Sequence, residues 1–453
     1  MYIYRYSCII LCFFIVNVSL FSQIDGEVKV FTLEQCLKIA EKQNFTNQLQ
    51  EAQVEVANAN LLASFGAYLP GVNFNSGYSR RLNVDGGQAI NVGGQVIRGF
   101  APPANSYSMS AIANYTIFDG FSRESNYSNS KISIDVTRNT LEQTKLQTSI
   151  DIRRQYLTVL RNKQVVEIRK ENLALGKAQL DQLKAAVEIG TNQIGVVFTQ
   201  EAEIGNRELE VVTAENNYNI SKAQLLSTMG LSPDTPAEFI DASIQNEIQK
   251  SEISSFKQKI GSKDKAIETS LQQRLNLKVA DLNKEVAKTN LTASRSGYLP
   301  SISASGGWSW SNSELNSFGL LGRSFVGVNL SIPIFDQFQT NSRVQSAELT
   351  IKQRDIEKEQ AVQTVKTEVQ TTLLNLDAAE KQLEITDKTV VSSEVNNKII
   401  TERFGNGLAT IIDILTANNQ LVTSKITKTN AVYNYIDAQF QVLNALGILP
   451  LQQ

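Results

Sequence analysis

The side chains that most often carry out acid–base or metal chemistry are sparse in this chain. None of its 453 residues is a histidine, which removes the commonest general base and the commonest metal ligand. Three cysteines occur, and Cys8 and Cys12 lie in an apolar stretch that we expect to be removed. Cys36 is then alone, so neither a disulfide nor a cysteine-based metal site is expected within the chain. The sequence therefore predicts no metal and no cofactor.

Motifs for catalysis are missing as well. The chain has no Gly-x-Ser-x-Gly, no phosphate-binding loop and no paired carboxylates at a readable spacing. Asp119 and Asp336 each stand between a strand pattern and a long helical pattern, where a helix N-cap is the expected role. Asp413 stands near the start of the last helical pattern, where the helix dipole favours an acid. We therefore expect no catalytic residues, and a protein that is not an enzyme.

The overall charge excludes one class of partner. Lys and Arg number 43 against 45 Asp and Glu, a net charge of −2, and the basic residues are scattered along the chain. Nucleic-acid binding needs a basic stripe or patch, so no nucleic acid is expected as a partner.

The N-terminus predicts export from the cytoplasm. Residues 7–20 form an apolar run of 14 residues after Arg5. This run is shorter than the ~20 residues that a membrane-spanning helix needs, and it is typical of a secretory signal. We assign residues 1–22 to a signal peptide, 23–231 to a first structural repeat, 232–262 to a linker or equatorial segment, and 263–453 to a second repeat.

Internal repetition supports this division. Ile-Phe-Asp occupies 117–119 and again 334–336, an offset of 336 − 119 = 217. An apolar residue followed by glycine occupies 229–230 and 446–447, an offset of 447 − 230 = 217. A constant offset over more than 100 residues indicates a duplicated unit.

Each copy is expected to contain a helix, two strands and two long helices. A first helix is predicted over 33–65, starting at a capping box of Thr32 and Gln35, and its counterpart is predicted over 265–295. After a Tyr-Leu-Pro tripeptide in each copy, apolar residues alternate with Ser and Asn, as in membrane-barrel strands. The four strand patterns are 72–79, 108–117, 301–310 and 325–334.

The helices after the strands are unusually long. Residues 121–189 contain no proline, which at 1.5 Å per residue predicts a rod of roughly 100 Å, and residues 341–404 are similar. In the last helix a row with alternating spacings of three and four predicts a coiled-coil seam. This row consists of Ile412, Leu415, Asn419, Val422, Ile426, Thr429, Tyr433, Ile436, Phe440 and Leu443.

Four membrane strands cannot close on themselves, and an open edge in lipid leaves backbone groups unpaired. Two copies would supply eight strands and three copies twelve. A barrel of about eight strands is filled by its own side chains, whereas a larger one leaves a channel. Small polar residues on the expected inner faces therefore favour three copies over two.

The order and spacing of these motifs resemble the TolC-type outer-membrane efflux family. The resemblance rests on Tyr-Leu-Pro before each strand pair, Ile-Phe-Asp after it, Tyr-Asn-Tyr at 433–435 and the turn at 407–415. It implies a mainly α-helical homotrimer, in which a 12-strand β-barrel among outer-membrane lipids continues into a 12-helix periplasmic α-barrel. It also implies an exit channel of a tripartite efflux or type I secretion system, a passive duct that a periplasmic adaptor and an inner-membrane pump open. The residues favour no single cargo among drugs, metal ions and proteins.

The resemblance also implies two sets of site residues. The helix-hairpin tips would contact the adaptor, although glycine turns alone would explain their sequence. These tip residues are Gly190, Thr191, Asn192, Gly405, Asn406, Gly407 and Leu408. A pore gate is implied at Asp413 with Phe404, Ile412 and Thr416. Thr416 stands where a second aspartate is expected and Ala409 where an arginine is, so the gate would rely on packing more than on charge.

An alternative class is a periplasmic coiled-coil adaptor or scaffold without a pore. Such proteins also carry helical hairpins. They lack two pairs of lipid-facing strands in a duplicated unit, so the strand patterns favour the channel.

Overall fold

The computed structural model describes residues 29–82, 89–98, 103–240, 248 and 250–449. The expected signal peptide, with Cys8 and Cys12, lies outside these ranges. No helix within them is both long enough and apolar enough to cross a membrane.

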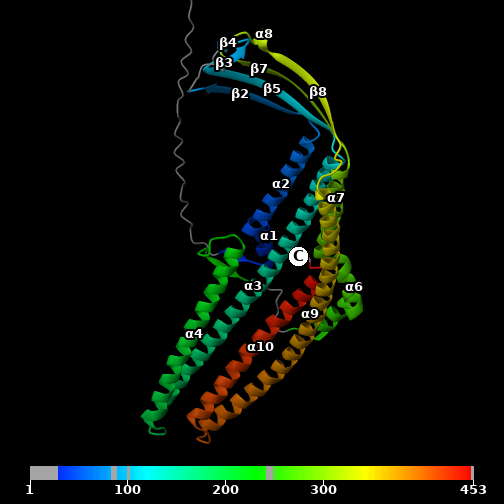
Figure 1. Cartoon of the computed structure of the whole chain (residues 1–453). Coiled ribbons are helices and arrows are strands. Elements are labelled where there is room, and N and C mark those ends of the chain that lie inside the picture. The colour runs from blue at the N-terminus through cyan, green and yellow to red at the C-terminus, as the bar shows by residue number, and fades with distance from the viewer. Residues whose placement is uncertain (1–28, 83–88, 99–102, 241–247, 249, 450–453) are drawn as a thin grey trace, which may run out of the picture.

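The molecule is elongated, with a curved sheet at one end and two long helical hairpins at the other (Figure 1). The first copy consists of α1 (Leu33–Gln43), α2 (Phe45–Gly66), β2 (Gly71–Arg80), β5 (Asn105–Phe118), α3 (Ser122–Glu188) and α4 (Ile194–Thr228). The second consists of α6 (Lys263–Gln273), α7 (Leu275–Arg295), β7 (Ser301–Asn312), β8 (Arg323–Ser331), α9 (Gln339–Gly405) and α10 (Ile411–Ala445). Both α3 and α9 have 67 residues and both α4 and α10 have 35, which supports duplication.

Shorter elements connect these two units. They are β1 (Lys29–Phe31), β3 (Ala89–Val92), β4 (Gln95–Arg98), β6 (Ala237–Phe239), α5 (Lys250–Ile260), a 3₁₀ turn at Ser296–Tyr298 and α8 (Phe318–Leu321). Strand β1 pairs in parallel with β6, which ties the start of the described chain to the segment between the copies. The connection between β2 and β5 contains the β3–β4 hairpin.

The first helix of each copy is broken in two, and the prediction of one continuous helix was wrong. The break falls at Asn44 in the first copy and at Arg274 in the second, both in extended backbone. Asn44 Oδ1 accepts a hydrogen bond from the Asn47 backbone N–H (3.0 Å), and Asn44 Nδ2 donates to the Thr228 carbonyl (2.7 Å). The Asn44 side chain therefore caps α2 and bonds the break to the end of α4. The capping box of Thr32 and Gln35 at the start of α1 is confirmed.

The main sheet is antiparallel with the order β2-β5-β7-β8. All four predicted strands are present. Within the protomer β2 and β8 are the outer strands, so each pairs with one neighbour only. Side chains of one face are apolar and those of the other are mainly Ser, Asn and Gly, because successive residues of a strand point to opposite faces.

The buried core follows the helices. One apolar cluster joins α1, α3, α4 and β6 around Tyr156 and Phe239, and a second joins α9 to α10. The sequence predicted a seam on α10 without a partner helix, and in the structure part of that row faces α3. Its members Tyr433, Ile436 and Phe440 pack against the α3 cluster. The row that faces α9 is displaced by two residues and uses small side chains, which let the helices approach closely. These side chains are Ala417, Ser424, Ala431, Ala438 and Ala445.

Candidate functional site: hairpin tips, helix starts and sheet face

The α3–α4 and α9–α10 hairpins end in tight turns whose backbone needs glycine at one position each. Gly190 has φ +78° and Gly407 has φ +72°, in the left-handed region that side chains disfavour. The Thr191 N–H donates to the Ala186 carbonyl (2.9 Å), and the Leu408 N–H donates to the Arg403 carbonyl (2.8 Å), as in helix C-caps. The sequence predicted both turns, whereas Gly405 is the last residue of α9 and needs no special backbone.

The two tips lie side by side and leave a groove between them. A cavity of about 490 Å³ is lined by residues of both hairpins. Five residues predicted from the sequence line it, namely Thr191, Asn192, Phe404, Gly405 and Gly407. Gly190, Asn406 and Leu408 do not line it, and Leu408 is exposed. The structure therefore brings most of the predicted tip residues to one concave surface of mixed polarity.

The start of α10 holds the residues of the predicted gate. Thr410 and Asp413 form a capping box in which the Thr410 N–H and hydroxyl both donate to Asp413 Oδ2 (2.7 Å each). These bonds, the backbone one first, lower the pKa of the Asp413 carboxyl. Ile412 is 67% exposed, and the exposed Thr416 donates its hydroxyl to the Ile412 carbonyl (2.7 Å). Within one protomer Asp413 thus acts as a helix cap and keeps its charge at the tip.

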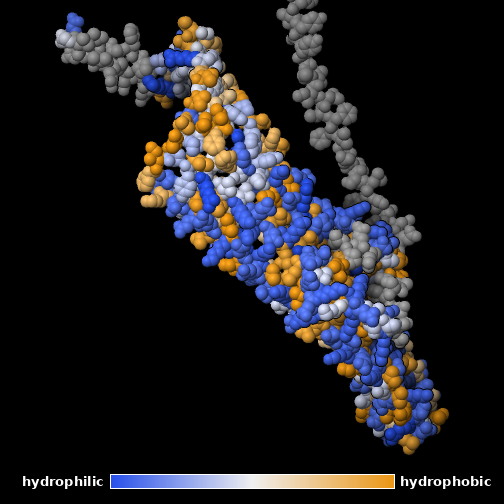
Figure 2. Space-filling view, turned by 90° about the vertical axis from the view of Figure 1, so that its right-hand side faces the viewer, coloured by the Kyte–Doolittle hydropathy of each residue, from blue (hydrophilic) through white to orange (hydrophobic). Residues whose placement is uncertain are grey.

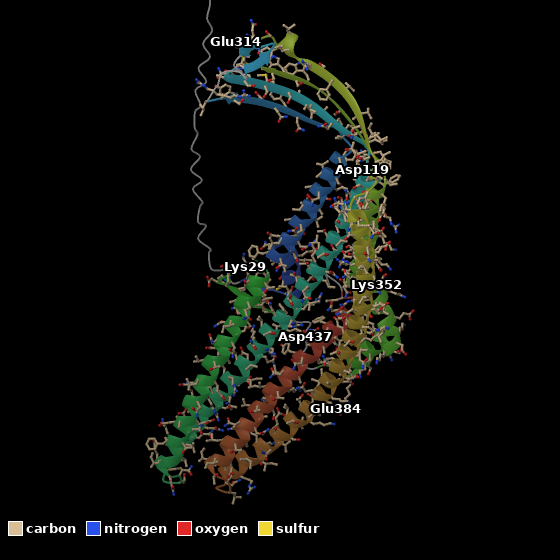
Figure 3. The ribbon with its side chains drawn as sticks, viewed as in Figure 1. Lys29, Asp119, Glu314, Lys352, Glu384 and Asp437 are labelled. Atoms are coloured by element: carbon tan, nitrogen blue, oxygen red, sulfur yellow. The ribbon has the colours of Figure 1, made fainter. Side chains whose placement is uncertain are left out.

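Two further aspartates stand where the sheet meets the helices. Asp119 Oδ2 accepts from the Arg123 N–H (2.9 Å), and Asp336 Oδ2 accepts from the Thr340 N–H (2.7 Å). Figure 3 shows Asp119 at this junction, far from the tips. Each side chain therefore bonds to the first turn of a long helix, but the N-cap positions predicted at these aspartates fall two residues later, at Phe121 and Phe338.

One polar cluster inside the α3–α4 hairpin was missed from the sequence. Arg207 is 1% exposed and donates from Nη1 to the Asn172 carbonyl (2.9 Å) and from Nε to Glu203 Oε1 (3.2 Å). Gln200 Nε2 donates to the carbonyl of Gly176 (2.9 Å). A Cβ at Gly176 would lie 2.6 Å from Arg207 Nη1, so this glycine makes room for the guanidinium.

Comparison of the two copies at the offset of 217 residues could have pointed to this cluster. Arg207 corresponds to residue 207 + 217 = 424, where the second copy has Ser424. The Ser424 hydroxyl lies 2.9 Å from that of Ser393 and joins α10 to α9 in a simple close contact. The first copy therefore has a long charged side chain where the second copy has a serine, and the single glycine of α3 lies nearby. This combination marks a place where the two hairpins differ.

The surface of the sheet differs from that of the helical body in its hydropathy. Figure 2 shows pale and orange residues over the sheet, whereas the helical body is predominantly blue. On the apolar face of the sheet Val72, Phe74, Val326 and Val328 are all well exposed in the protomer. No group of three or more His, Cys, Asp or Glu side chains in the described ranges could hold a metal ion.

Comparison with known proteins agrees with this geometry. The model of the outer membrane efflux protein family matches residues 37–231 and 266–448, which are the two copies. Outer membrane protein TolC of Vibrio cholerae is 27% identical over 419 residues, covering 88% of this chain and 87% of the relative. Outer membrane efflux protein BepC of Brucella suis is 21% identical over 433 residues, covering 93% and 86%.

A solved structure has the same fold. The CmeC outer membrane channel of Campylobacter jejuni superposes with a TM-score of 0.74 at 18% identity, covering 93% of this chain and 87% of that one. These relatives are channels and outer-membrane proteins, so they support the channel and not the pore-free scaffold. Because the family model covers both copies of the duplicated unit, the chain belongs to the outer membrane efflux protein family and is an outer-membrane channel protein that serves efflux.

Proposed function

We propose that three copies of this chain form a passive exit duct, a 12-strand β-barrel in the outer membrane that continues into a 12-helix tunnel in the periplasm. A periplasmic adaptor and an inner-membrane pump would dock at the hairpin tips and supply the energy. The division into residues 1–22, 23–231, 232–262 and 263–453 is part of this proposal.

The observation that carries the proposal is the open sheet. Strands β2 and β8 each leave one edge without a partner inside the protomer, and unpaired backbone groups cost several kcal/mol each in lipid. Placing β8 of one copy beside β2 of the next satisfies both edges. Two copies give 4 × 2 = 8 strands and three give 4 × 3 = 12 strands. The polar face carries Ser303, Ser305 and Asn329, which suits the wet lumen of the larger barrel.

The height of the sheet also fits a bilayer. Along β5, Tyr107 and Phe118 are 118 − 107 = 11 residues apart, which is about 36 Å at 3.3 Å per residue. With a strand tilt of about 40° this spans about 28 Å, close to the apolar band of about 25 Å in outer-membrane barrels. At the end of the sheet that adjoins the helices, each copy has a pair of perpendicular aromatic rings. These pairs are Phe118–Phe121, with ring centroids 5.3 Å apart, and Phe335–Phe338, with ring centroids 5.5 Å apart.

The tips suit docking of another helical protein. The groove between the hairpins combines Phe404 and Leu183 with the polar Gln179, Thr191 and Asn192. Such a surface fits the end of an amphipathic helical hairpin. We therefore assign adaptor contact to the tips, with Gly190, Asn406 and Leu408 at their outer rims.

A gate at the start of α10 is part of the same proposal. Ile412, Asp413 and Thr416 are exposed on α10, whereas Ile414 and Ala417 are buried against the protomer. In a threefold assembly the exposed face would meet its copies around the axis, and three carboxylates of Asp413 would attract cations. Phe404 lies half-buried in the neighbouring groove and would support this face by packing.

The first experiment is the protein mass of the complex extracted in detergent from a separated outer-membrane fraction. We expect three protomer masses and stepwise ion conductance when the complex is added to a planar bilayer. A monomer recovered with the water-soluble periplasmic proteins would refute the duct and favour the pore-free scaffold.

A pair of substitutions separates the two roles of Asp413. Asp413→Asn keeps an oxygen for the Thr410 cap and removes the charge, whereas Asp413→Ala removes both. If the carboxylate forms the gate, both variants should relieve block of the channel by divalent cations. Glu188→Gln, at the tip of the other hairpin, is the control and should leave the block unchanged. Wild-type block in the asparagine variant would limit Asp413 to helix capping.

A further inference from the structure

On the apolar face of the sheet, the residue types change in a fixed order toward the end that lies away from the helices. Registers place Ala111 beside Trp308, Met109 beside Trp310, and Tyr107 beside Tyr78, in successive rows. The Tyr78 and Tyr107 rings are 5.0 Å apart. By strand alternation Arg80 shares the face of Val72, Phe74 and Tyr78, and it ends β2 one row farther out. Aliphatic residues are thus followed by Trp, then Tyr, then Arg.

The β7–β8 loop folds back over this face. Helix α8 places the Phe318 ring 4.4 Å from the Trp310 ring. A Cβ at Gly322 would lie 2.5 Å from Trp308 Nε1, so the loop rests directly on the second indole. As a result Trp310 is only 2% exposed although it belongs to the outward face of an open sheet. Figure 3 shows Glu314, in the same loop, at the opposite end of the molecule from the hairpin tips.

The folded loop presents apolar side chains away from the protein. Leu320 is 85% exposed, and Leu315, Phe318 and Leu321 are also exposed, in a loop whose other residues are mostly Ser, Asn and Gly. In water the exposed apolar surface of these side chains would remain uncovered, although Phe318 also packs on Trp310. They lie beside the row of Trp and Tyr that typically marks the boundary between lipid chains and headgroups.

We propose that α8, together with Trp308 and Trp310 (the tryptophan ledge), forms an interfacial anchor that inserts into the outer leaflet of the membrane. In this anchor Arg80 binds the phosphate of an anionic lipid. This inference rests on the proposed barrel, which places the loop at the outer surface. The ligand class follows from chemistry: Leu320 and Phe318 reach the acyl boundary, and the planar guanidinium of Arg80, one row outside the tyrosines, matches a phosphate.

Fluorophores on single cysteines can test the anchor and the barrel separately. The natural Cys36 is fully buried, and burial raises the pKa of its thiol to about 12, so it will not compete for the label. In a background with Cys8 and Cys12 replaced by serine, an environment-sensitive dye is attached at Leu320→Cys, at Val326→Cys on the strand, or at Lys352→Cys on α9. The protein is reconstituted into vesicles whose lipid chains carry bromine, a quencher.

The inference expects quenching at positions 320 and 326 and none at 352. Quenching at 326 without quenching at 320 would overturn the anchor while the barrel stands. Absence of quenching at both positions would overturn the barrel and the anchor together.

The two natural tryptophans report on the phosphate site. The chain has only Trp308 and Trp310, so their quenching by brominated phosphatidylglycerol, relative to brominated phosphatidylcholine, measures enrichment of anionic lipid at the ledge. One arginine near the surface is expected to enrich it about fivefold. Arg80→Gln should reduce this ratio toward one, whereas Arg323→Gln, on the lumen face of β8, should not. Equal quenching by the two lipids in the wild type would overturn the phosphate site.

Discussion

Gly176 and Arg207 provide a quantitative test of how the α3–α4 hairpin is packed. In an ordinary helix interior, Gly176→Ala should stabilise, because alanine loses less conformational freedom than glycine, by roughly 0.5–1 kcal/mol. Here the new methyl group would lie 2.6 Å from Arg207 Nη1 and 3.3 Å from both Cδ and Cζ. The guanidinium cannot swing into water without leaving a site where it is 1% exposed and bonded to the Asn172 carbonyl.

Whether Gly176→Ala stabilises or destabilises the hairpin depends on whether Arg207 is present. Overpacking of this kind costs about 1–3 kcal/mol, so Gly176→Ala alone should destabilise the hairpin by about 0–2 kcal/mol. Arg207→Ala removes the clash, and in that background Gly176→Ala should stabilise by about 1 kcal/mol. The coupling free energy between the two sites is the difference, about 1–3 kcal/mol.

Amide hydrogen exchange is the appropriate assay, because it measures the free energy of local opening in the intact protein. The four proteins of the cycle are compared at the amides of residues 170–180, with α9 as an internal reference. Gly195→Ala, in the first turn of α4 where no atom lies within 4 Å of the added Cβ, is the matched control. If Gly176→Ala slows exchange equally with and without Arg207, the packing argument is refuted.

Three further predictions use single groups. Asn44→Ala should weaken the α1–α2 joint by about 2–4 kcal/mol in hydrogen exchange, because it removes a helix cap and leaves the Thr228 carbonyl unpaired. Asn44→Asp also loses the Nδ2 donor but keeps the cap, so it should cost less, and equal losses would contradict the role of Oδ1 as the cap. The Cys36 thiol should resist maleimide at pH 7.5 until the protein is denatured, since its pKa is about 12; rapid labelling of the native protein would disprove its burial. The Thr410 bonds lower the pKa of Asp413 below its ordinary 3.8, so cation block should be constant from pH 8 to 5 and decline only as the pH falls through the lowered pKa; loss of block near pH 6 would contradict this.

The sequence predicted the regular parts of the fold because their signals are local. Alternation of apolar and polar residues identified all four strands of the main sheet, and long proline-free stretches identified α3 and α9. The turns at Gly190 and Gly407 followed from the backbone that only glycine adopts easily. The tip residues were implied by the family resemblance at these turns, and the structure brings four of the seven, with the predicted gate residue Phe404, to one groove.

Features that depend on distant contacts were not predicted. The break at Asn44 has no proline or glycine to mark it, because it forms around a hydrogen bond to Thr228, 184 residues away. The row of α10 that faces α9 is displaced by two residues from the predicted seam, and the sequence did not show which helix each row faces, because periodicity gives only the spacing of a seam. Helix α8 lies on the sheet only because Phe318 finds Trp310, and local composition does not encode that contact.

By itself the sequence determined the duplication, the strand and helix periods, the lack of histidine and the family resemblance, since each depends on residue types at short or constant spacing. The tertiary structure decided where the helices break, that Arg207 is buried opposite Gly176, and that Asp413 caps α10 within the protomer. It also decided that the outer loop covers the tryptophans. These features depend on packing between segments far apart in the chain, where the three-dimensional arrangement alone determines which side chains meet.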